Sequence, residues 1–397
     1  MSLSLQDLTQ SPNKLANAYR SSAVAQRIQL TGHTHQALPD VAQQAYQEHW
    51  ECLSKYGEER WEKVFDKAYT LREGFAAMID DEAENIALAS SIHDLFVRFL
   101  SILPLAERPR IITTDSEPPS IRRQLGRIAE EGVEIVTVAS EPASDLVERI
   151  AGKINDKTAA VCLSSVSYES GHQTLELDTL LPVCQKFGAE LFVDAYQSVN
   201  VLPFSLEDYN LHQAFVVGGG AKYCQMGSGT CFMHVPPGRD FRPKVTGWFG
   251  CFDPIYDNPA ATPIAYADDA SRFNGSTVDA LPYFRGCKVL EHFQQWQLTP
   301  DFLFEINHHQ LNLLAREFLA LDLPKEMIHL PVDVEYMGGF LALKSPHARS
   351  LSEKMRDRGV HTDYRGHWLR LGPAPYLCDE QLEDSMLALT EALDEVK

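Results

Sequence analysis

Three short apolar runs, each ending in a polar or glycine-rich turn, lie in the middle of the chain. They cover residues 191–193, 214–217 and 230–235. Continuous apolar runs of this length are typical of strands buried on both faces, as in a sheet covered by helices. The first run ends at Asp194, and the second ends at three glycines that are followed by Ala221 and Lys222. The pattern therefore predicts two core strands with reactive side chains at their carboxyl ends.

The segment that precedes these runs alternates between strand-like and helix-like patterns. Helices are predicted at 39–53 and 61–78, followed by strands at 86–89, 110–113, 133–138, 159–164 and 190–193, with helices at 119–131, 143–154 and 178–187 between the later strands. Such alternation indicates a parallel sheet with right-handed crossover connections. The expected fold class is α/β, with a mostly parallel central sheet in a large domain.

The order of elements changes near residue 290. A helix is predicted from residue 281 onward, and the C-terminal part is predicted to contain a helix at 301–321, short strands near 328–344, a helix at 347–358, a strand at 360–371 and a helix at 379–396. This order is typical of a small α+β domain. We expect a large cofactor-binding domain at 41–289 and a small domain made of 1–40 together with 290–397.

Composition narrows the class of protein. The chain has 397 residues, 44% of them hydrophobic, and a net charge of −20, which argues against nucleic acid and anionic membranes as partners. No apolar run is long enough to span a bilayer, and the first residues lack the pattern of a signal peptide. The eight cysteines are scattered without zinc-site spacing, which suits a reducing compartment. We expect a cytoplasmic protein.

Asp194 and Lys222 are the leading candidates for chemistry. Open α/β sheets bind ligands at the carboxyl ends of their strands, where both residues are predicted to lie. A lysine can condense with the aldehyde of pyridoxal 5'-phosphate, and a carboxylate can hold its pyridine nitrogen protonated. A lone Asp–Lys pair would more simply be a salt bridge. The sequences Asp194-Ala195-Tyr196-Gln197 and Ala221-Lys222 favour the cofactor site, because they resemble the class V aminotransferase group of fold-type I enzymes.

Two further segments contain polar candidates. Ser90 and Ser91 follow the predicted strand 86–89, where they could cap a helix or help to hold a phosphate on its free N–H groups. His33 and His35 alternate in a segment predicted to be extended, which would place them on one side. No third ligand accompanies them, so no metal is expected, and a loop entering a substrate site is preferred.

The resemblance becomes more specific toward the C-terminus. Four motifs follow the lysine in this order: Gly-Trp-Phe-Gly at 247–250, Arg-Phe-Asn-Gly-Ser-Thr at 272–277, Asp363-Tyr364-Arg365, and Leu-Arg-Leu-Gly-Pro-Ala-Pro at 369–375. With them the chain resembles a kynureninase-type member of the class V group nearly from end to end. The resemblance implies a fold-type I transferase fold, pyridoxal 5'-phosphate as cofactor and a homodimer with shared active sites.

The resemblance also implies a role for each matching residue. Lys222 would bind the cofactor and later move protons, Asp194 would pair with the ring nitrogen, and Gln197 would bond the ring oxygen. Around the phosphate it places Ser91, Ile92, Ser164, Trp248 and Thr277, the last two from a partner subunit. Arg370 would clamp the α-carboxylate of an amino acid through a bidentate fork. The residues that would recognise the side chain of the substrate are His33, Thr34, His35 and Glu58.

The chain departs from the kynureninase pattern at several positions. Gln197 stands where a histidine is usual, Ala221 stands where a tyrosine is usual, and 114–119 lacks the aromatic residue expected over the cofactor. Three functions therefore stay open: a hydrolase or lyase that cleaves a C–C or C–S bond of the substrate's side chain, an aminotransferase or a sulfur transferase that uses a loop cysteine such as Cys251, and a non-catalytic protein that binds the cofactor. We expect the substrate to be an amino acid other than kynurenine.

Overall fold

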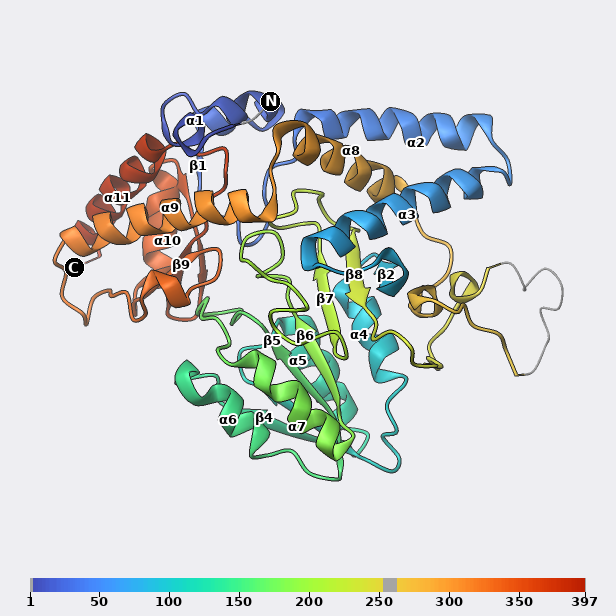
Figure 1. The fold of residues 1–397 in the computed structure, drawn as a ribbon. Helices are drawn as coiled ribbons and strands as arrows, with labels where there is room; N and C mark the ends of the chain where they lie inside the picture. Colours follow the sequence, from blue (N-terminus) through green and yellow to red (C-terminus); the bar gives the residue numbers. More distant parts are fainter. Residues whose placement is uncertain (1–2, 253–262, 397) are drawn as a thin grey trace.

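The computed structural model describes residues 3–252 and 263–396, and a seven-stranded sheet forms its centre (Figure 1). The strands are arranged in the order β2-β8-β7-β6-β5-β3-β4. Their bounds are β2 Ile86–Ala89, β3 Arg110–Thr114, β4 Glu134–Val138, β5 Thr158–Ser164, β6 Glu190–Asp194, β7 Phe215–Gly219 and β8 Cys231–His234. Only β8 runs antiparallel to its neighbours within this sheet. The predicted α/β fold with a mostly parallel sheet is thus confirmed.

The sheet is covered on both faces, as the continuous apolar runs predict. Along β5, Val161 and Leu163 join one hydrophobic cluster while Ala160 and Cys162 join the other. Side chains alternate across a strand, so only a sheet packed on both sides can bury all of them. The covering helices are α4 Ile92–Leu100 and α5 Pro119–Ala129 on one side, and α3 Arg60–Ile79, α6 Leu146–Ala151 and α7 Leu180–Phe187 on the other.

Three helices pack together beside the β2 edge of the sheet. The helix α2 spans Gln43–Lys55 and packs with α3 and with α8, Leu281–Trp296. The helix predicted at 39–53 begins with a short 3-10 turn at Asp40–Ala42 before α2 starts. The predicted boundary between the domains at residue 289 falls inside α8. The division into domains at 41–289 therefore stays a prediction.

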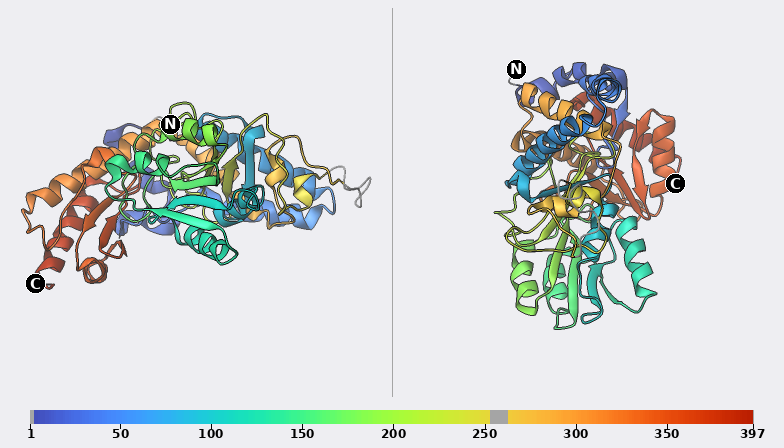
Figure 2. Two further views of the ribbon diagram at one scale, coloured as in Figure 1. Left: turned by 90° about the horizontal axis from the view of Figure 1, so that it is seen from below. Right: turned by 90° about the vertical axis from the view of Figure 1, so that its right-hand side faces the viewer.

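The C-terminal elements gather at one end of the molecule (Figures 1 and 2). They comprise α9 Pro300–Ala320, β9 Leu341–Lys344, α10 Ala348–Asp357, β10 Val360–His361, β11 Asp363–Arg365, β12 Trp368–Leu371 and α11 Asp379–Asp394. The single strand predicted at 360–371 is wrong. The chain turns at Gly366, which has a φ of 53°, so β11 and β12 form a hairpin that continues into β9.

The N-terminal segment packs against these C-terminal elements. It begins with α1, Leu5–Thr9, and its strand β1, Ile28–Gln29, pairs in parallel with β10. The Asn13 side chain donates a hydrogen bond of 3.0 Å to the Pro375 carbonyl oxygen. Thr31 then bridges to Gly372, which places the 31–35 turn beside the end of β12. None of the helices in the described ranges has the length and apolar character needed to cross a bilayer.

Candidate active site

Asp194 and Lys222 share one pocket at the carboxyl ends of β6 and β7. Asp194 is the last residue of β6, and Lys222 follows the three glycines that end β7. These glycines are required by close packing: a Cβ at Gly220 would lie 2.1 Å from the Thr230 Oγ1 atom, and one at Gly219 would lie 2.5 Å from the Tyr196 ring. The pocket has a volume of about 330 Å³, and its lining includes Thr34, Ser91, Pro118 and Tyr168.

The Lys222 amine is poised to act as a nucleophile. The pKa of Lys222 is lowered to about 8, mainly because burial disfavours the charged amine; the Asp194 charge opposes this shift and the Arg370 charge adds to it. The Lys222 Nζ atom lies 4.7 Å from the centre of the Tyr196 ring. A lysine with a lowered pKa carries a larger share of free amine near neutral pH, which is the form that attacks an aldehyde.

Asp194 is a buried acceptor for a cation. It is only 4% exposed, and its Oδ1 atom accepts a hydrogen bond of 2.9 Å from the Tyr196 backbone N–H. Burial raises the pKa of Asp194, while that hydrogen bond and the charge of Lys222 favour the ionised form. A protonated pyridine nitrogen would supply the cation that stabilises this carboxylate.

The N-terminus of α4 forms the third side of the pocket. Ser90, Ser91, Ile92 and His93 line the pocket, and Ser91 is the N-cap of α4. The Ser91 Oγ atom accepts a hydrogen bond of 3.2 Å from the Asp94 N–H. A helix N-terminus favours an anionic phosphate. An amine, a buried carboxylate and a helix N-terminus in one pocket fit pyridoxal 5'-phosphate. Ser91 and Ile92 line this pocket, and their contact with the phosphate stays a prediction.

Gln197 and Ser164 lie near this pocket, but their side chains bond to other protein groups. The Gln197 amide donates to the His33 carbonyl oxygen at 3.2 Å and accepts from the Tyr223 hydroxyl at 3.2 Å. The Ser164 hydroxyl donates to the Glu117 Oε2 atom at 2.6 Å. Neither residue is among the described residues that line the Lys222 pocket. Their cofactor contacts stay predictions that these hydrogen bonds do not support.

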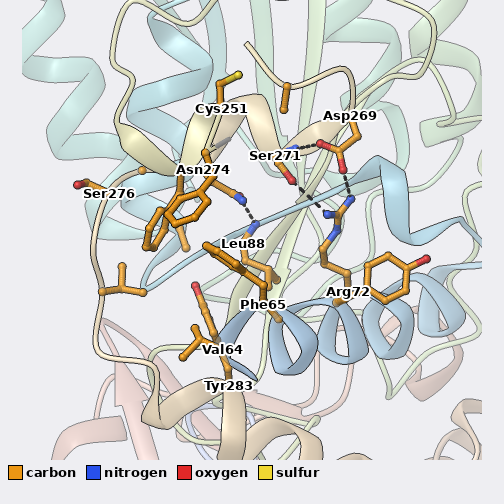
Figure 3. Close-up of a pocket in the computed structure, with 18 of the residues that line it drawn as sticks. Val64, Phe65, Arg72, Leu88, Cys251, Asp269, Ser271, Asn274, Ser276 and Tyr283 are labelled. Carbon is orange, nitrogen blue, oxygen red and sulfur yellow. Dashed lines mark hydrogen bonds and ion pairs between the residues drawn. The ribbon is translucent and has the colours of Figure 1, made fainter. Parts of the chain in front are cut away.

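Trp248 and Thr277 lie outside the Lys222 pocket of their own chain. Trp248 belongs to a 3-10 turn and its ring stacks on Phe252 at 4.9 Å, while Thr277 is exposed. The adjacent Ser276 and Val278 line a second hollow of about 730 Å³ (Figure 3). The loop is anchored there by an ion pair of 2.7 Å between Arg72 and Asp269. The predicted contact of Trp248 and Thr277 with a partner's phosphate stays a prediction.

The turn at 31–35 places its two histidines differently. Thr34 and His35 donate their backbone N–H groups to the Thr31 carbonyl oxygen, so this segment is a turn and not an extended strand. His33 is fully buried and stacks on Phe340 at 4.5 Å, whereas His35 is exposed. The prediction that both imidazoles lie on one side is therefore wrong. Thr34, between them, lines the pocket. No cluster of side chains suited to a metal occurs in the described ranges.

Arg370 lies beside the pocket and is fully buried. Its Nη1 atom donates to the Tyr168 carbonyl oxygen at 2.6 Å, and its Nη2 atom lies 3.0 Å from the Asp363 carboxylate. A second arginine, Arg365, donates to the Tyr168 hydroxyl at 3.1 Å and is partly exposed. Glu58 lies on the exposed turn between α2 and α3 and is absent from the described lining of the Lys222 pocket. Its predicted contact with substrate has no support within one subunit.

Sequence reasoning assigned no role to three residues near this site, Glu117, Tyr168 and Arg365, although Arg365 was part of a motif behind the resemblance. Glu117 follows β3 and Tyr168 follows β5, so both lie at the same carboxyl edge of the sheet as Asp194 and Lys222. Their position just after a buried strand could therefore have identified Glu117 and Tyr168 as candidate site residues. Arg365 lacked such a signal, because the β11–β12 turn was not predicted.

Comparison with known proteins agrees with this geometry. Residues 31–227 match the model of the family Aminotransferase class-V. The uncharacterized aminotransferase YcbU of Bacillus subtilis (strain 168) is 25% identical over 266 residues, which cover 66% of this chain and 68% of the relative. Isopenicillin N epimerase of Streptomyces clavuligerus is 25% identical over 350 residues, which cover 81% and 83%.

Solved structures show the same fold over nearly the whole chain. C-DES with glycine covalently linked to its pyridoxal phosphate cofactor superimposes with a TM-score of 0.83 at 17% identity, covering 94% of this chain and 98% of that one. The cysteine desulfurase from Thermococcus onnurineus NA1 gives a TM-score of 0.78 at 15% identity, with full coverage of both proteins. These neighbours share the fold, and the resemblance to kynureninases in particular stays a prediction. Residues 31–227 are thus similar to the class-V aminotransferase family, and the chain has the fold of the fold-type I pyridoxal phosphate enzymes.

Proposed function

We propose that the protein is a pyridoxal phosphate-dependent lyase that cleaves a bond in the side chain of an α-amino acid, with a C–S bond favoured over a C–C bond. C–S cleavage is favoured because one structural neighbour is described as a cystine C–S lyase in complex with cysteine persulfide. When bound, the cofactor supplies an electron sink for the bonds at the substrate's α-carbon. The protein supplies binding, orientation and proton transfer.

Each protein group has a distinct task in this proposal. The Lys222 amine holds the cofactor and then moves a proton at the α-carbon. The Asp194 carboxylate keeps the ring nitrogen protonated, and the N-terminus of α4 holds the phosphate. Arg370 orients the substrate through its α-carboxylate, which requires the guanidinium to exchange part of its contact with Asp363 and Tyr168 for the substrate.

The surroundings of the cysteines favour a lyase over a sulfur transferase, because a sulfur transferase needs a reactive cysteine at the site. All eight cysteines lie in the described ranges; seven are buried, and Cys251 is partly exposed. Within one subunit, Cys251 lines the larger hollow and is absent from the described lining of the Lys222 pocket, and the Cys251→Ser variant below tests whether it acts in a partner's site. Cys231 does line that pocket, but burial raises its pKa to about 12. A thiol with so high a pKa is a poor sulfur acceptor, so the cleaved fragment leaves to solution.

A panel of amino acids tests the proposal. Purified protein loaded with pyridoxal 5'-phosphate is incubated with cysteine, cystine, other β-substituted amino acids and kynurenine, and the products are identified. Release of ammonia and a sulfur product, with the cofactor spectrum unchanged at the end, supports a lyase. The Cys251→Ser variant serves as control and should retain full turnover. Loss of turnover in this variant would contradict the assignment.

The same panel separates the other candidates. A keto acid together with conversion of the cofactor to its amine form would identify an aminotransferase, the class named for the Bacillus relative. Loss of optical activity without cleavage would identify an epimerase, as named for the Streptomyces relative. A bound, reducible cofactor without any turnover would identify a non-catalytic binding protein.

A further inference from the structure

Glu117 is a fully buried carboxyl group that the proposed reaction does not use. It lies in the turn between β3 and α5 and is 1% exposed. Three donors converge on it: the Ser164 N–H at 3.1 Å and the Thr114 hydroxyl at 2.6 Å bond to Oε1, and the Ser164 hydroxyl bonds to Oε2 at 2.6 Å. Glu117 thereby joins the carboxyl ends of the neighbouring strands β3 and β5.

The turn that contains Glu117 forms one wall of the Lys222 pocket. The next residue, Pro118, lines the pocket together with Ser120 and Ile121. Proline fixes its own φ and restricts the residue before it to extended conformations, so the direction of the Pro118 ring follows from how Glu117 is held. The rest of the turn is held elsewhere, by the Ser116 and Ser167 hydroxyls at 2.5 Å.

Glu117 also interacts electrostatically with the cofactor-binding carboxylate. Ser164 and Asp194 are paired residues of the adjacent strands β5 and β6, so one residue separates Glu117 from the end of β6. The pKa of Glu117 is raised to about 7, mainly by burial and in part by the Asp194 charge, while the hydrogen bonds from Ser164 and Thr114 oppose the shift. Burying a carboxyl group costs free energy of desolvation, and its hydrogen bonds can offset this cost while they fix the backbone around it.

We propose that Glu117 is a positioning residue of the cofactor site, which acts through Pro118 and Ser164 to set the wall that Pro118 forms in the Lys222 pocket. The inference rests on the proposed function only in that the Lys222 pocket binds pyridoxal 5'-phosphate. Glu117 itself does not touch the reacting atoms. Its side chain defines one geometry of the β3–α5 turn, and the shape of this pocket wall depends on that geometry.

The test compares Glu117→Leu and Glu117→Gln by cofactor titration and by the circular dichroism that the bound cofactor shows in the visible range. Leucine matches the size but leaves three buried donors without an acceptor, so we expect about tenfold weaker binding or more, and a reduced dichroism per bound cofactor. Glutamine keeps both hydrogen bonds at Oε1, and the Ser164 hydroxyl can turn to accept the third. Glu117→Gln should therefore restore both the affinity and the dichroism to near the wild-type values.

A control separates positioning from general stability. Asp81→Asn weakens a buried pair of 2.5 Å between Asp81 and His234, and neither residue is among the described lining of the Lys222 pocket. It should lower the melting temperature without changing the affinity or the dichroism. If Glu117→Leu does not fold, Thr114→Val removes one donor and should give a smaller change in the same direction.

The outcomes are distinguishable. Unchanged affinity and dichroism in Glu117→Leu, or in Thr114→Val where that variant is needed, would overturn the inference and leave the proposed function intact. Failure of Glu117→Gln to restore both signals would also overturn it. Absence of bound cofactor in the wild-type protein would overturn the proposed function and the inference together.

Discussion

At the scale of single residues, the site depends on ionisable groups whose pKa values are changed by burial. Lys222 and Glu117 are shifted in opposite senses, because burial disfavours the charged form of each. Both shifts place a titration near neutral pH, so both can be measured without substrate.

The pKa of Lys222, about 8, sets the rate of cofactor uptake. Only the free amine attacks the aldehyde, so the rate at which the apoprotein takes up pyridoxal 5'-phosphate should rise with pH and level off above about 8. Stopped-flow absorbance measures this rate. Lys222→Ala is the control and should show no visible absorbance that borohydride bleaches. A reducible, coloured Lys222→Ala protein would assign the cofactor to another lysine.

Glu117 should make the free energy of unfolding depend on pH. Its pKa in the folded protein, about 7, exceeds the ordinary value of 4.5, so the folded state binds its proton more tightly. This contribution to stability is complete below about pH 4.5 and is lost as the pH rises through 7, which amounts to about 3 kcal/mol. Glu117→Gln lacks this titration. Urea unfolding at several pH values should therefore show wild type losing stability relative to the variant. Parallel curves would refute the shift.

At the scale of elements, the β11–β12 hairpin determines the proposed substrate clamp. Asp363 and Arg370 face each other as paired residues of this hairpin, and Arg365 lies at its turn. The sequence analysis predicted the role of Arg370 but assigned 360–371 to one strand, so it did not predict the pairing of Arg370 with Asp363. Gly366 creates the turn because it adopts a positive φ at no steric cost.

Arg370→Ala should strongly reduce catalytic efficiency for every amino acid substrate. Loss of a buried, hydrogen-bonded charge contact costs on the order of 2–5 kcal/mol, while the cofactor absorbance should stay intact. Arg365→Ala is a matched control on the same hairpin, and because its side chain is 43% exposed the effect should be smaller. Steady-state kinetics on both variants decide the assignment. A larger loss in Arg365→Ala would identify Arg365 as the clamp.

At the scale of the whole molecule, the site of one subunit lacks two of its predicted phosphate contacts. Trp248 and Thr277 lie in the loop around the larger hollow and not in the Lys222 pocket. An arrangement in which each subunit contributes this loop to its partner would complete both sites, and two-fold dimers are the commonest closed assemblies.

Mixing inactive variants tests this arrangement. Lys222→Ala and Thr277→Val each remove one part of a shared site, so a mixed dimer should contain one complete site and recover part of the activity. Each variant mixed with itself is the control and should stay inactive. An active monomer, measured by light scattering at the assay concentration, would exclude shared sites.

Local pattern was sufficient to predict the central sheet and the strand-end positions of Asp194 and Lys222, whereas their assignment to a cofactor came from the resemblance. Continuous apolar runs require burial on both faces, and the residues that end these runs lie at one edge of a parallel sheet. Asp194, Lys222 and the N-terminus of α4 followed from this rule without knowledge of any contact between distant residues.

Only the tertiary structure decided which polar side chains are available to a ligand. Ser164 is bonded to Glu117 of another strand end, Gln197 to the backbone of His33, and Arg370 to Asp363 across a hairpin. His33 is buried while His35 is exposed, because a turn replaces the extended segment. These differences arise from hydrogen bonds between residues far apart in the sequence or from turns that reverse its direction. Hydrophobic periodicity reports which face of an element is buried, but it carries no information on which partner a buried polar group finds.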